Sequence, residues 1–451
     1  MIIGIGMSNP FLVGVITLGL LLGLIFIGVR VVFAAAIVGL VGLVELRGWG
    51  PAAGIIGTIP HAKSSTYALS VLPMFIFIGF LAFHAGMTQQ LFDAARKWLG
   101  WLPGGLAVAT VFATAGFAAV SGASTATAAV FSRVAIPEML KYGYDRRMAA
   151  GVVASAGTLA TLIPPSAILV IYAIIVEQSV GKLLLAGFLP GIFSAFVYAG
   201  IIVVWAVMRP GSAPSVSGFT WGERMRTLPG ISPIILVVVI VMSAIYGGWA
   251  TPTEAGALGA AVVFVLALAR GTPLSAIKSS LMESAKLTVM IFSLIWGVLI
   301  FVRFLGFSGI PGAFTQWVVN LDMAPMTIMI LILLAYAILG MFMDAIGMLL
   351  LTLPVVYPAV MALGFDPIWF GIIVVKMAEV CLITPPIGLN CFVVNGVRPD
   401  IPLGDVFRGV ALFFIADVIT IAALLMFPEI VTWLPNFDFE AWWSGLWAVT
   451  Q

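Results

Sequence analysis

Two proline pairs mark the residues of this chain that are best placed to do chemistry. Pro164-Pro165 and Pro385-Pro386 each lie in a long apolar stretch. Because proline lacks an N–H and its ring clashes with the carbonyl four residues earlier, each pair frees two backbone carbonyl oxygens. Inside a bilayer a freed carbonyl needs a partner, and a small hard cation such as sodium is a suitable one. The freed carbonyls are those of Ala160, Thr161, Cys381 and Leu382.

The two proline pairs belong to an internal repeat. The sequence spacing between Pro164 and Pro385 also separates three further pairs of identical residues, with no gap in the alignment. Pro137, Gly143 and Asp145 match Pro358, Gly364 and Asp366. Proline and glycine fix backbone geometry, so the repeated object is a backbone shape. Hydrophobic segments interrupted by Gly and Pro at matching positions of two halves are typical of secondary transporters.

A short polar or small-residue break precedes each repeated stretch, at 121–127 in the first half and 340–345 in the second. We expect the stretches 122–142 and 345–363 to form re-entrant hairpins, each followed by a helix that its proline pair breaks. The helix that restarts after each pair directs its N–H groups and positive dipole end to the same place, which favours an anionic substrate. Side-chain oxygens that could complete two cation shells are those of Ser121, Ser124, Thr125, Asp344 and Thr384.

Several of these residues have structural alternatives. The run 113–129 is also compatible with close packing of small residues between helices. Asp344 lies inside an apolar run, where a carboxylate is either functional or hydrogen-bonded to a neighbouring helix. Arg303 could hold a substrate carboxylate or extend to the membrane surface. Lys376 and Glu379, three residues apart on a helix, could simply neutralise each other.

Other residues are expected to be structural. Asp145 and Asp366 follow glycine and precede apolar runs, as helix N-caps do. The segment 251–254, Thr-Pro-Thr-Glu, has the pattern of a capping box with proline at the first helical position. Cys381 and Cys391 are expected to be ordinary buried residues.

Composition identifies the elements that must position these residues. Of 451 residues 62% are hydrophobic and only 8% charged, whereas a soluble domain carries about 25% charged residues. The formal net charge of +2 leaves no basic excess for nucleic acid, and two cysteines cannot make a disulfide scaffold. A helix needs about 20 apolar residues to cross a bilayer. Runs of this length without charge occupy 1–29, 64–92, 98–132, 148–176, 183–208, 227–253, 323–343 and 345–365.

These runs predict an all-α polytopic membrane protein built from two inverted structural repeats. The expected order is scaffold, first transport-domain repeat, scaffold, second repeat and a C-terminal helix with its tail. The corresponding ranges are 1–63 (scaffold), 64–181 (first repeat, with the broken helix at 146–178), 182–270 (scaffold, with a polar loop at 209–230), 271–400 (second repeat, with the broken helix at 367–397) and 401–451.

The motifs resemble those of one family. The chain is similar to the large membrane subunit, the DctM-like permease, of tripartite ATP-independent periplasmic (TRAP) transporters over nearly its whole length. The chain departs from the family at Ala123, where the family usually has serine, so only the backbone is expected to contribute there. The resemblance is most specific at 117–124, 143–147, 163–166, 251–255 and 382–390.

This resemblance implies a function and partners. It implies an elevator-type secondary transporter, like others of the ion transporter superfamily, in the bacterial inner membrane. It also implies uptake of an organic acid coupled to two or more Na⁺, with no organic cofactor. The implied partners are a small TRAP membrane subunit, a periplasmic substrate-binding protein and membrane lipid. The implied substrates are C4-dicarboxylates, sialic acids and related acids.

The resemblance also implies site residues. The first Na⁺ site would use Ser121, Gly122, Ser124, Thr125, Ala160, Ile163 and Pro165. The second Na⁺ site would use Gly340, Asp344, Cys381, Thr384 and Pro386. The substrate would meet Ser124, Ser166, Arg303, Gly388 and Asn390.

Rival functions make different demands on the sequence. A standalone sodium–dicarboxylate symporter would share the hairpins and broken helices but would work without a binding protein. An intramembrane metalloprotease would need a motif such as His-Glu-x-x-His, whereas this chain has two widely separated histidines. A channel would need a continuous pore lined by polar rings. We therefore expect a transporter rather than an enzyme.

Overall fold

The computed structural model describes residues 9–209 and 211–437, and these residues form helices and connecting segments with no β-strand. The first half contains α1 (Pro10–Phe26), α2 (Val31–Arg47), α3 (Trp49–Ser64), η1 (Tyr67–Ser70), α4 (Val71–His84), α5 (Met87–Leu99), α6 (Gly105–Ser121), α7 (Ser124–Lys141), α8 (Arg146–Ala156), η2 (Gly157–Thr161), α9 (Ala167–Ile175), α10 (Val180–Met208) and α11 (Trp221–Met225). The second half contains α12 (Leu228–Tyr246), α13 (Pro252–Ala269), α14 (Leu274–Ser308), α15 (Ile310–Val319), α16 (Pro325–Gly340), α17 (Ala345–Ala362), α18 (Pro367–Cys381), α19 (Leu389–Val397), α20 (Leu403–Met426), α21 (Glu429–Thr432) and η3 (Leu434–Asn436).

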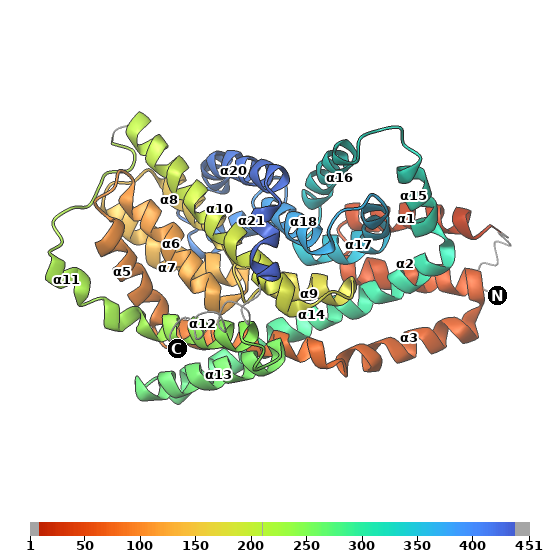
Figure 1. Cartoon of the computed structure of the whole chain (residues 1–451), viewed down its shortest axis with the longest axis horizontal. Helices are drawn as coiled ribbons and strands as arrows, with labels where there is room; N and C mark the ends of the chain where they lie inside the picture. Colours follow the sequence, from red (N-terminus) through yellow and green to blue (C-terminus); the bar gives the residue numbers. More distant parts are fainter. Residues whose placement is uncertain (1–8, 210, 438–451) are drawn as a thin grey trace, which may run out of the picture.

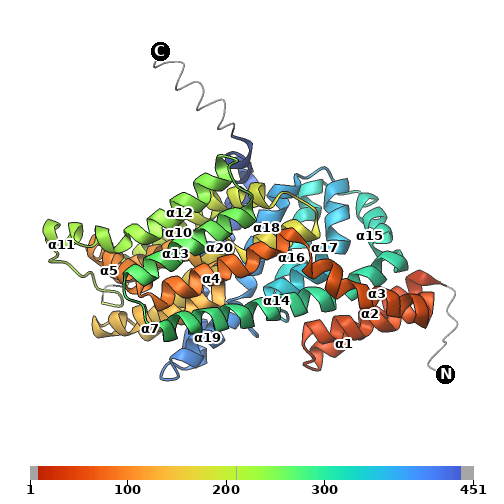
Figure 2. The same cartoon turned by 90° about the horizontal axis from the view of Figure 1, so that it is seen from below.

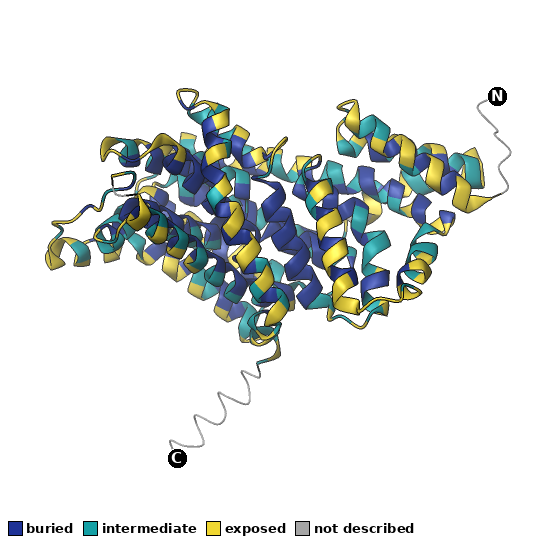
Figure 3. Cartoon of the chain, turned by 90° about the horizontal axis from the view of Figure 1, so that it is seen from above, coloured by how far each residue is buried: buried dark blue, intermediate teal, exposed yellow. Residues whose placement is uncertain are grey.

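The helices form an elongated body (Figure 1). Helices α1 to α3 lie at one end and α5 and α11 at the other, with α9 and α18 between them. The 35-residue helix α14 packs against both α2 and α4 (Figure 2). Buried residues concentrate in the central helices, while the outer helices carry the exposed positions (Figure 3). The broken helices therefore lie in the protein interior, where irregular backbone is tolerated within a membrane.

The length and composition of the helices confirm the prediction of an all-α polytopic membrane protein. Three shorter apolar helices, α1, α6 and α16, accompany the long ones. Large apolar side chains on outward positions, such as Phe26 and Val265, remain exposed and are the surface a lipid would cover. Within residues 9–209 and 211–437, seven helical segments are long and apolar enough to span a bilayer: Tyr67–His84, Val180–Met208, Trp221–Tyr246, Pro252–Ala269, Leu274–Ser308, Ala345–Ala362 and Leu403–Met426.

The predicted bounds of the two hairpins are wrong. The stretches 122–142 and 345–363 each hold one uninterrupted helix, α7 and α17. The chain reverses earlier, between α6 and α7 and between α16 and α17, and the two helices of each pair contact one another. Pro137 lies inside α7 without ending it, so proline alone does not locate the turn. We call the segment 121–124 break 1 and the segment 340–344 break 2.

The two broken helices occupy the predicted ranges. In the first, α8 continues into η2, residues 162–166 are not helical, and α9 restarts the helix. In the second, α18 ends at Cys381 and α19 begins at Leu389. The Pro164-Pro165 and Pro385-Pro386 peptide bonds are both cis.

The predicted caps are present. The Asp145 carboxylate accepts a hydrogen bond from the Arg147 N–H at 2.7 Å, and Asp366 accepts from Ile368 at 2.9 Å. Thr251 and Glu254 form the predicted capping box at the start of α13. These residues anchor helix ends and are not candidates for the transport site.

Two predicted segments are described only in part. The polar loop 209–230 contains the short helix α11, and its Ser212 carbonyl accepts the Asp145 N–H at 3.0 Å, so the loop folds back onto the start of α8. The C-terminal range 401–451 contains α20, while its predicted tail over 438–451 lies outside the described residues, as do residues 1–8 of the first scaffold segment.

Candidate functional site

Break 1 lies directly against the first proline pair. Gly122 has a left-handed backbone with φ of 58°, and a Cβ atom there would lie 2.5 Å from the carbonyl oxygen of Pro165. The Gly122 carbonyl accepts a hydrogen bond from the Ala167 N–H at 3.4 Å. Only glycine fits both the conformation and the space. The structure thus brings Ser121, Gly122 and Pro165 together, as the first predicted cation site requires.

The hydroxyl groups of break 1 form a short chain. Thr127 donates its hydrogen to the Ala123 carbonyl at 2.8 Å, so the 2.8 Å contact between Ser121 and Thr127 has Ser121 as the donor. Each hydroxyl oxygen retains lone-pair capacity after these bonds. Ser121 and Ser124 are buried, and Thr125 is half-buried. Break 1 therefore offers neutral oxygens that are largely buried.

The second half of the chain reaches break 1 through Asn390. The amide Nδ2 of this α19 residue donates to Ser124 Oγ at 2.9 Å and to the Ala154 carbonyl at 3.0 Å. Both amide hydrogens are therefore used, while Oδ1 is buried without a hydrogen-bond partner in the described part of the chain. A buried acceptor without a partner is uncommon and costly, and it fits a cation ligand or a substrate contact. Two predicted substrate residues, Ser124 and Asn390, are thus in direct contact.

The protein itself satisfies two of the four freed carbonyls. Ser166 donates its hydroxyl hydrogen to the Thr161 carbonyl at 2.5 Å, and the Asn390 N–H donates to the Leu382 carbonyl at 2.9 Å. Ser166 also caps α9 by accepting the Leu169 N–H at 3.3 Å. The single hydroxyl hydrogen of Ser166 is thereby used, and the predicted contact between Ser166 and substrate stays a prediction. Cation ligation by freed carbonyls remains a prediction for Ala160 and Cys381.

Break 2 is built differently. A Cβ atom on Gly340 would lie 1.6 Å from Cys381 Sγ, so α16 runs directly against α18. Asp344 caps α17 by accepting the Gly347 N–H at 3.0 Å. The alternative in which Asp344 bonds to a neighbouring helix is therefore wrong, since its partner is on its own helix. The Thr384 hydroxyl donates to Val380 at 2.6 Å and Cys381 Sγ donates to Met377 at 3.1 Å, which leaves backbone and lone-pair oxygens for a cation.

Two predicted substrate residues take other roles or lie apart. Gly388 is the N-cap of α19 with φ of 50°, and a Cβ there would lie 2.7 Å from the Phe407 ring, so close packing requires glycine at this position. Its predicted contact with substrate stays a prediction. Arg303 is exposed on α14, and no contact in the described residues joins it to Ser124 or Asn390. Its neighbour Val302 instead lines an apolar pocket.

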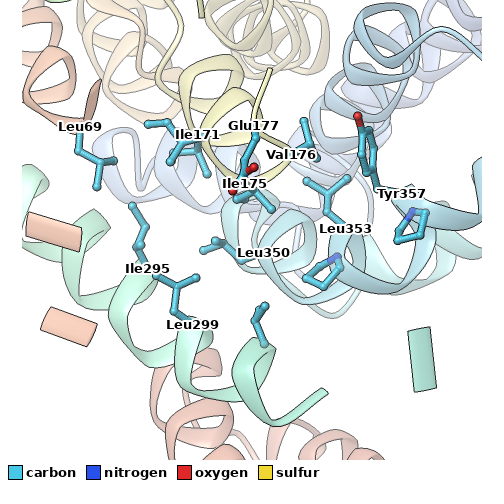
Figure 4. Close-up of a pocket in the computed structure, with 14 residues that line it drawn as sticks. Leu69, Ile171, Ile175, Val176, Glu177, Ile295, Leu299, Leu350, Leu353 and Tyr357 are labelled. Atoms are coloured by element: carbon cyan, nitrogen blue, oxygen red, sulfur yellow. The ribbon is translucent and has the colours of Figure 1, made fainter. Parts of the chain in front are cut away.

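This apolar pocket lies between α9, α14 and α17 and has a volume of about 350 Å³ (Figure 4). Its wall consists of side chains such as Ile171, Leu299 and Leu353, and its polar side chains are Glu177 and Tyr357. Among the described residues, the wall carries a carboxylate and no Lys, Arg or His side chain to balance it, so the pocket does not suit an organic acid.

A buried charged network was only partly predicted. Lys376 Nζ lies 2.5 Å from Glu379 Oε2, as the spacing suggested, and also 2.8 Å from Asp417 Oδ1 on α20. Tyr198 of α10 donates to Asp417 at 2.6 Å, and Thr161 of η2 contacts Glu379 at 2.5 Å. All three charged side chains have zero exposure. The sequence signal for Asp417 was a lone carboxylate within an apolar run, which is a functional or structural marker in a membrane helix.

The fold and the site define a class: a polytopic membrane protein with repeated broken helices that meet at buried polar oxygens. The model for the family described as "Tripartite ATP-independent periplasmic transporter, DctM component" matches residues 18–430. The chain belongs to this family and is a multi-pass inner-membrane transporter subunit. The resemblance inferred from the motifs is confirmed.

Known proteins similar to this chain agree with that assignment. The C4-dicarboxylate TRAP transporter large permease protein DctM of Pseudomonas aeruginosa is 37% identical over 82% of this chain and 85% of its own length. The sialic acid TRAP transporter large permease protein SiaM of Vibrio cholerae is 28% identical over 92% of this chain and 96% of its own. The crystal structure of the Alcanivorax borkumensis YdaH transporter matches 95% of this chain and all of its own with a TM-score of 0.57 and 14% identity, which supports the fold alone.

Proposed function

We propose that this chain is the large subunit of a sodium-coupled transporter that imports a small organic acid anion by an elevator movement. The observation that carries the proposal is the meeting of Ser124 and Asn390, one from each half, beside the first proline pair. A polar contact between the helix break of one half and the broken helix of the other is the architecture expected of a substrate and ion site near the bilayer midplane.

Sodium is the coupling ion that best fits the oxygens at break 1. The unpartnered Oδ1 of Asn390 and the hydroxyls of Ser121 and Ser124 are hard, neutral donors. In the described residues no group of three or more His, Cys, Asp or Glu side chains gathers. When bound, a monovalent cation would supply positive charge beside the substrate, and the residues that would hold it at break 1 include Ser121, Ser124 and Asn390.

An organic acid is the proposed substrate class. The relatives at 37% and 28% identity are named for C4-dicarboxylate and for sialic acid, and both ligand classes carry a carboxylate. The restarted helices α9 and α19 both begin beside break 1, since the Ala167 N–H donates to Gly122 and the Asn390 amide donates to Ser124. Their N-terminal dipoles favour an anion there. The higher identity favours a C4-dicarboxylate, so succinate is the first probe.

The elevator proposal rests on a close approach between two sets of helices. Gly79 of α4 faces break 1 so tightly that a Cβ there would lie 2.5 Å from the Cα of Ser121. A glycine at such a contact leaves a smooth surface between α4 and the α6–α7 pair. We assign α4 to the scaffold, although the sequence placed its range in the first transport-domain repeat, and we assign the α6–α7 pair to the moving part. The proposed partners are a small membrane subunit and a periplasmic substrate-binding protein.

Uptake into proteoliposomes tests this function. The chain would be reconstituted with its small subunit, and radiolabelled succinate would be added with or without the binding protein and an inward sodium gradient. We expect saturable uptake only when both the binding protein and the gradient are present. Full uptake without the binding protein would favour the standalone symporter, and full uptake with potassium replacing sodium would contradict sodium coupling.

A further inference from the structure

A second cleft starts at break 1 and leads away from it. Its volume is about 170 Å³, and it runs between α4, α7 and α14, which lie together in Figure 2. One end is lined by Ser121 and Ala123 of break 1. The other end is lined by His84, Arg133 and Glu283. The cleft is smaller than the roughly 300–1,000 Å³ of sites for drug-sized ligands, so it suits a small one.

One face of α7 forms the floor of this cleft. Ala126, Ala129 and Arg133 follow one another at spacings of three and four residues, which places them on one side of a helix. From Ala123 to Arg133 the helix rises by about 15 Å at about 1.5 Å per residue. The two alanines leave open space along that length, and the guanidinium lies at the far end.

The charges at the far end favour an anion. Arg133 is exposed and has neither an ion pair nor a hydrogen bond among the described residues. The neighbouring carboxylate, that of Glu283, lies 3.4 Å from His84 Nε2 instead. An arginine next to apolar helix surface gains most from a carboxylate, which its planar guanidinium can bind through two parallel hydrogen bonds.

We propose that this cleft is the path along which the substrate carboxylate travels between break 1 and the membrane surface, and that Arg133 is its binding residue there. The inference rests on the proposed transport of an organic acid and assigns to Arg133 the role that the sequence had suggested for Arg303. Arg303, by contrast, adjoins the apolar pocket that contains Glu177.

Kinetics of three variants test the assignment. In proteoliposomes with the small subunit, the binding protein and a sodium gradient, Arg133→Gln should raise the KM for succinate by about tenfold or more through loss of a charge-assisted pair. Arg133→Lys should recover part of the loss because it keeps the charge. Arg226→Gln, the matched control in the exposed central loop, should stay within about twofold of the unaltered protein. An unchanged KM in Arg133→Gln would overturn the assignment.

Protection of an introduced cysteine gives a readout that does not depend on transport. Both native cysteines are buried, so Ala126→Cys would be labelled selectively by a charged methanethiosulfonate reagent. Succinate with sodium should slow labelling of Ala126→Cys by about fivefold or more, and should not slow labelling of Ser215→Cys, which lies in the exposed central loop. Equal labelling rates with and without succinate, in a protein that transports succinate, would refute the cleft. Absence of sodium-driven succinate uptake by the unaltered protein would instead refute the proposed function.

Discussion

Break 1 and break 2 occupy matching places in the two halves but are held by different means. Break 1 contains neutral hydroxyls and is completed from outside its own half, by Asn390 donating to Ser124. Break 2 is completed locally, by the Asp344 carboxylate that caps α17. The two halves share their cis proline pairs and their Asp-capped turns, while the breaks differ in length and in the groups that hold them. The conformation of break 1 therefore depends on the packing of the two halves against each other, whereas that of break 2 depends on a single helix cap.

We expect the largest effect, a loss of stability, from changes in the buried charged network of Lys376, Glu379 and Asp417, which joins both broken helices. Lys376→Met would leave two buried carboxylates without their cation, and we expect a loss of about 3–5 kcal/mol in unfolding free energy. Thermal unfolding followed by tryptophan fluorescence would measure the loss, with the exposed Lys182→Met as control.

The network prediction has a compensating test. Replacing all three charges, as Lys376→Met, Glu379→Gln and Asp417→Asn together, should recover most of the stability, because no uncompensated charge then remains. A single Lys376→Met variant that unfolds at the same temperature as Lys182→Met would show that the network does not hold the broken helices together.

The second effect concerns the packing of break 1. Gly122→Ala combines a left-handed backbone with a clash against the Pro165 carbonyl, whereas Gly143→Ala has a similar backbone, φ of 81°, and nothing within 4 Å. We expect about 1–2 kcal/mol of destabilisation at Gly143 from conformation alone and a clearly larger loss at Gly122. Sodium-driven uptake should fail in Gly122→Ala and persist in Gly143→Ala. Equal behaviour of the two variants would mean that the contact between break 1 and the proline pair is not needed.

The third prediction distinguishes two roles of Asp344 at break 2, as the N-cap of α17 and as a ligand of sodium. Asparagine is as good an N-cap as aspartate, so Asp344→Asn should keep the unfolding free energy within about 0.5 kcal/mol, while Asp344→Ala should lose about 1 kcal/mol. If the carboxylate also binds sodium, both variants should need more sodium for half-maximal uptake. An unchanged sodium requirement in Asp344→Asn would leave Asp344 with the capping role alone.

Sequence predicted the backbone better than the contacts. The proline pairs, Gly122 and the cap Asp145 were recognisable because their residue types themselves constrain dihedral angles or helix ends. The hairpin turns were misplaced because polarity and internal prolines do not show on which side of a break a helix reverses.

Long-range pairing could not be predicted. The resemblance placed Asn390 and Ser124 at one substrate site, but nothing along the chain indicates their direct hydrogen bond. Nor does it indicate that Asp417 shares Lys376 with Glu379, since these residues come together only when separate helices pack. The sequence also did not indicate that the hydroxyl of Ser166, which the resemblance placed against substrate, donates to the Thr161 carbonyl that the prolines had freed. Residue types thus showed which side chains are polar, whereas the packing of the helices determines which hydrogen-bond and ion-pair partners they have.

Specific stabilisation by sodium tests most directly the central claim that the two halves build a sodium site at break 1. The unfolding temperature of the detergent-solubilised protein would be measured in NaCl and in KCl at equal ionic strength, for the unaltered chain and for Ser124→Ala and Asn390→Ala. A bound ligand stabilises the folded state by about 2.7 kcal/mol at a hundred times its Kd. We predict a higher unfolding temperature in NaCl than in KCl for the unaltered protein and a difference that is lost or much reduced in both variants. Equal unfolding temperatures in the two salts for the unaltered protein, or an undiminished sodium effect in both variants, would contradict the account.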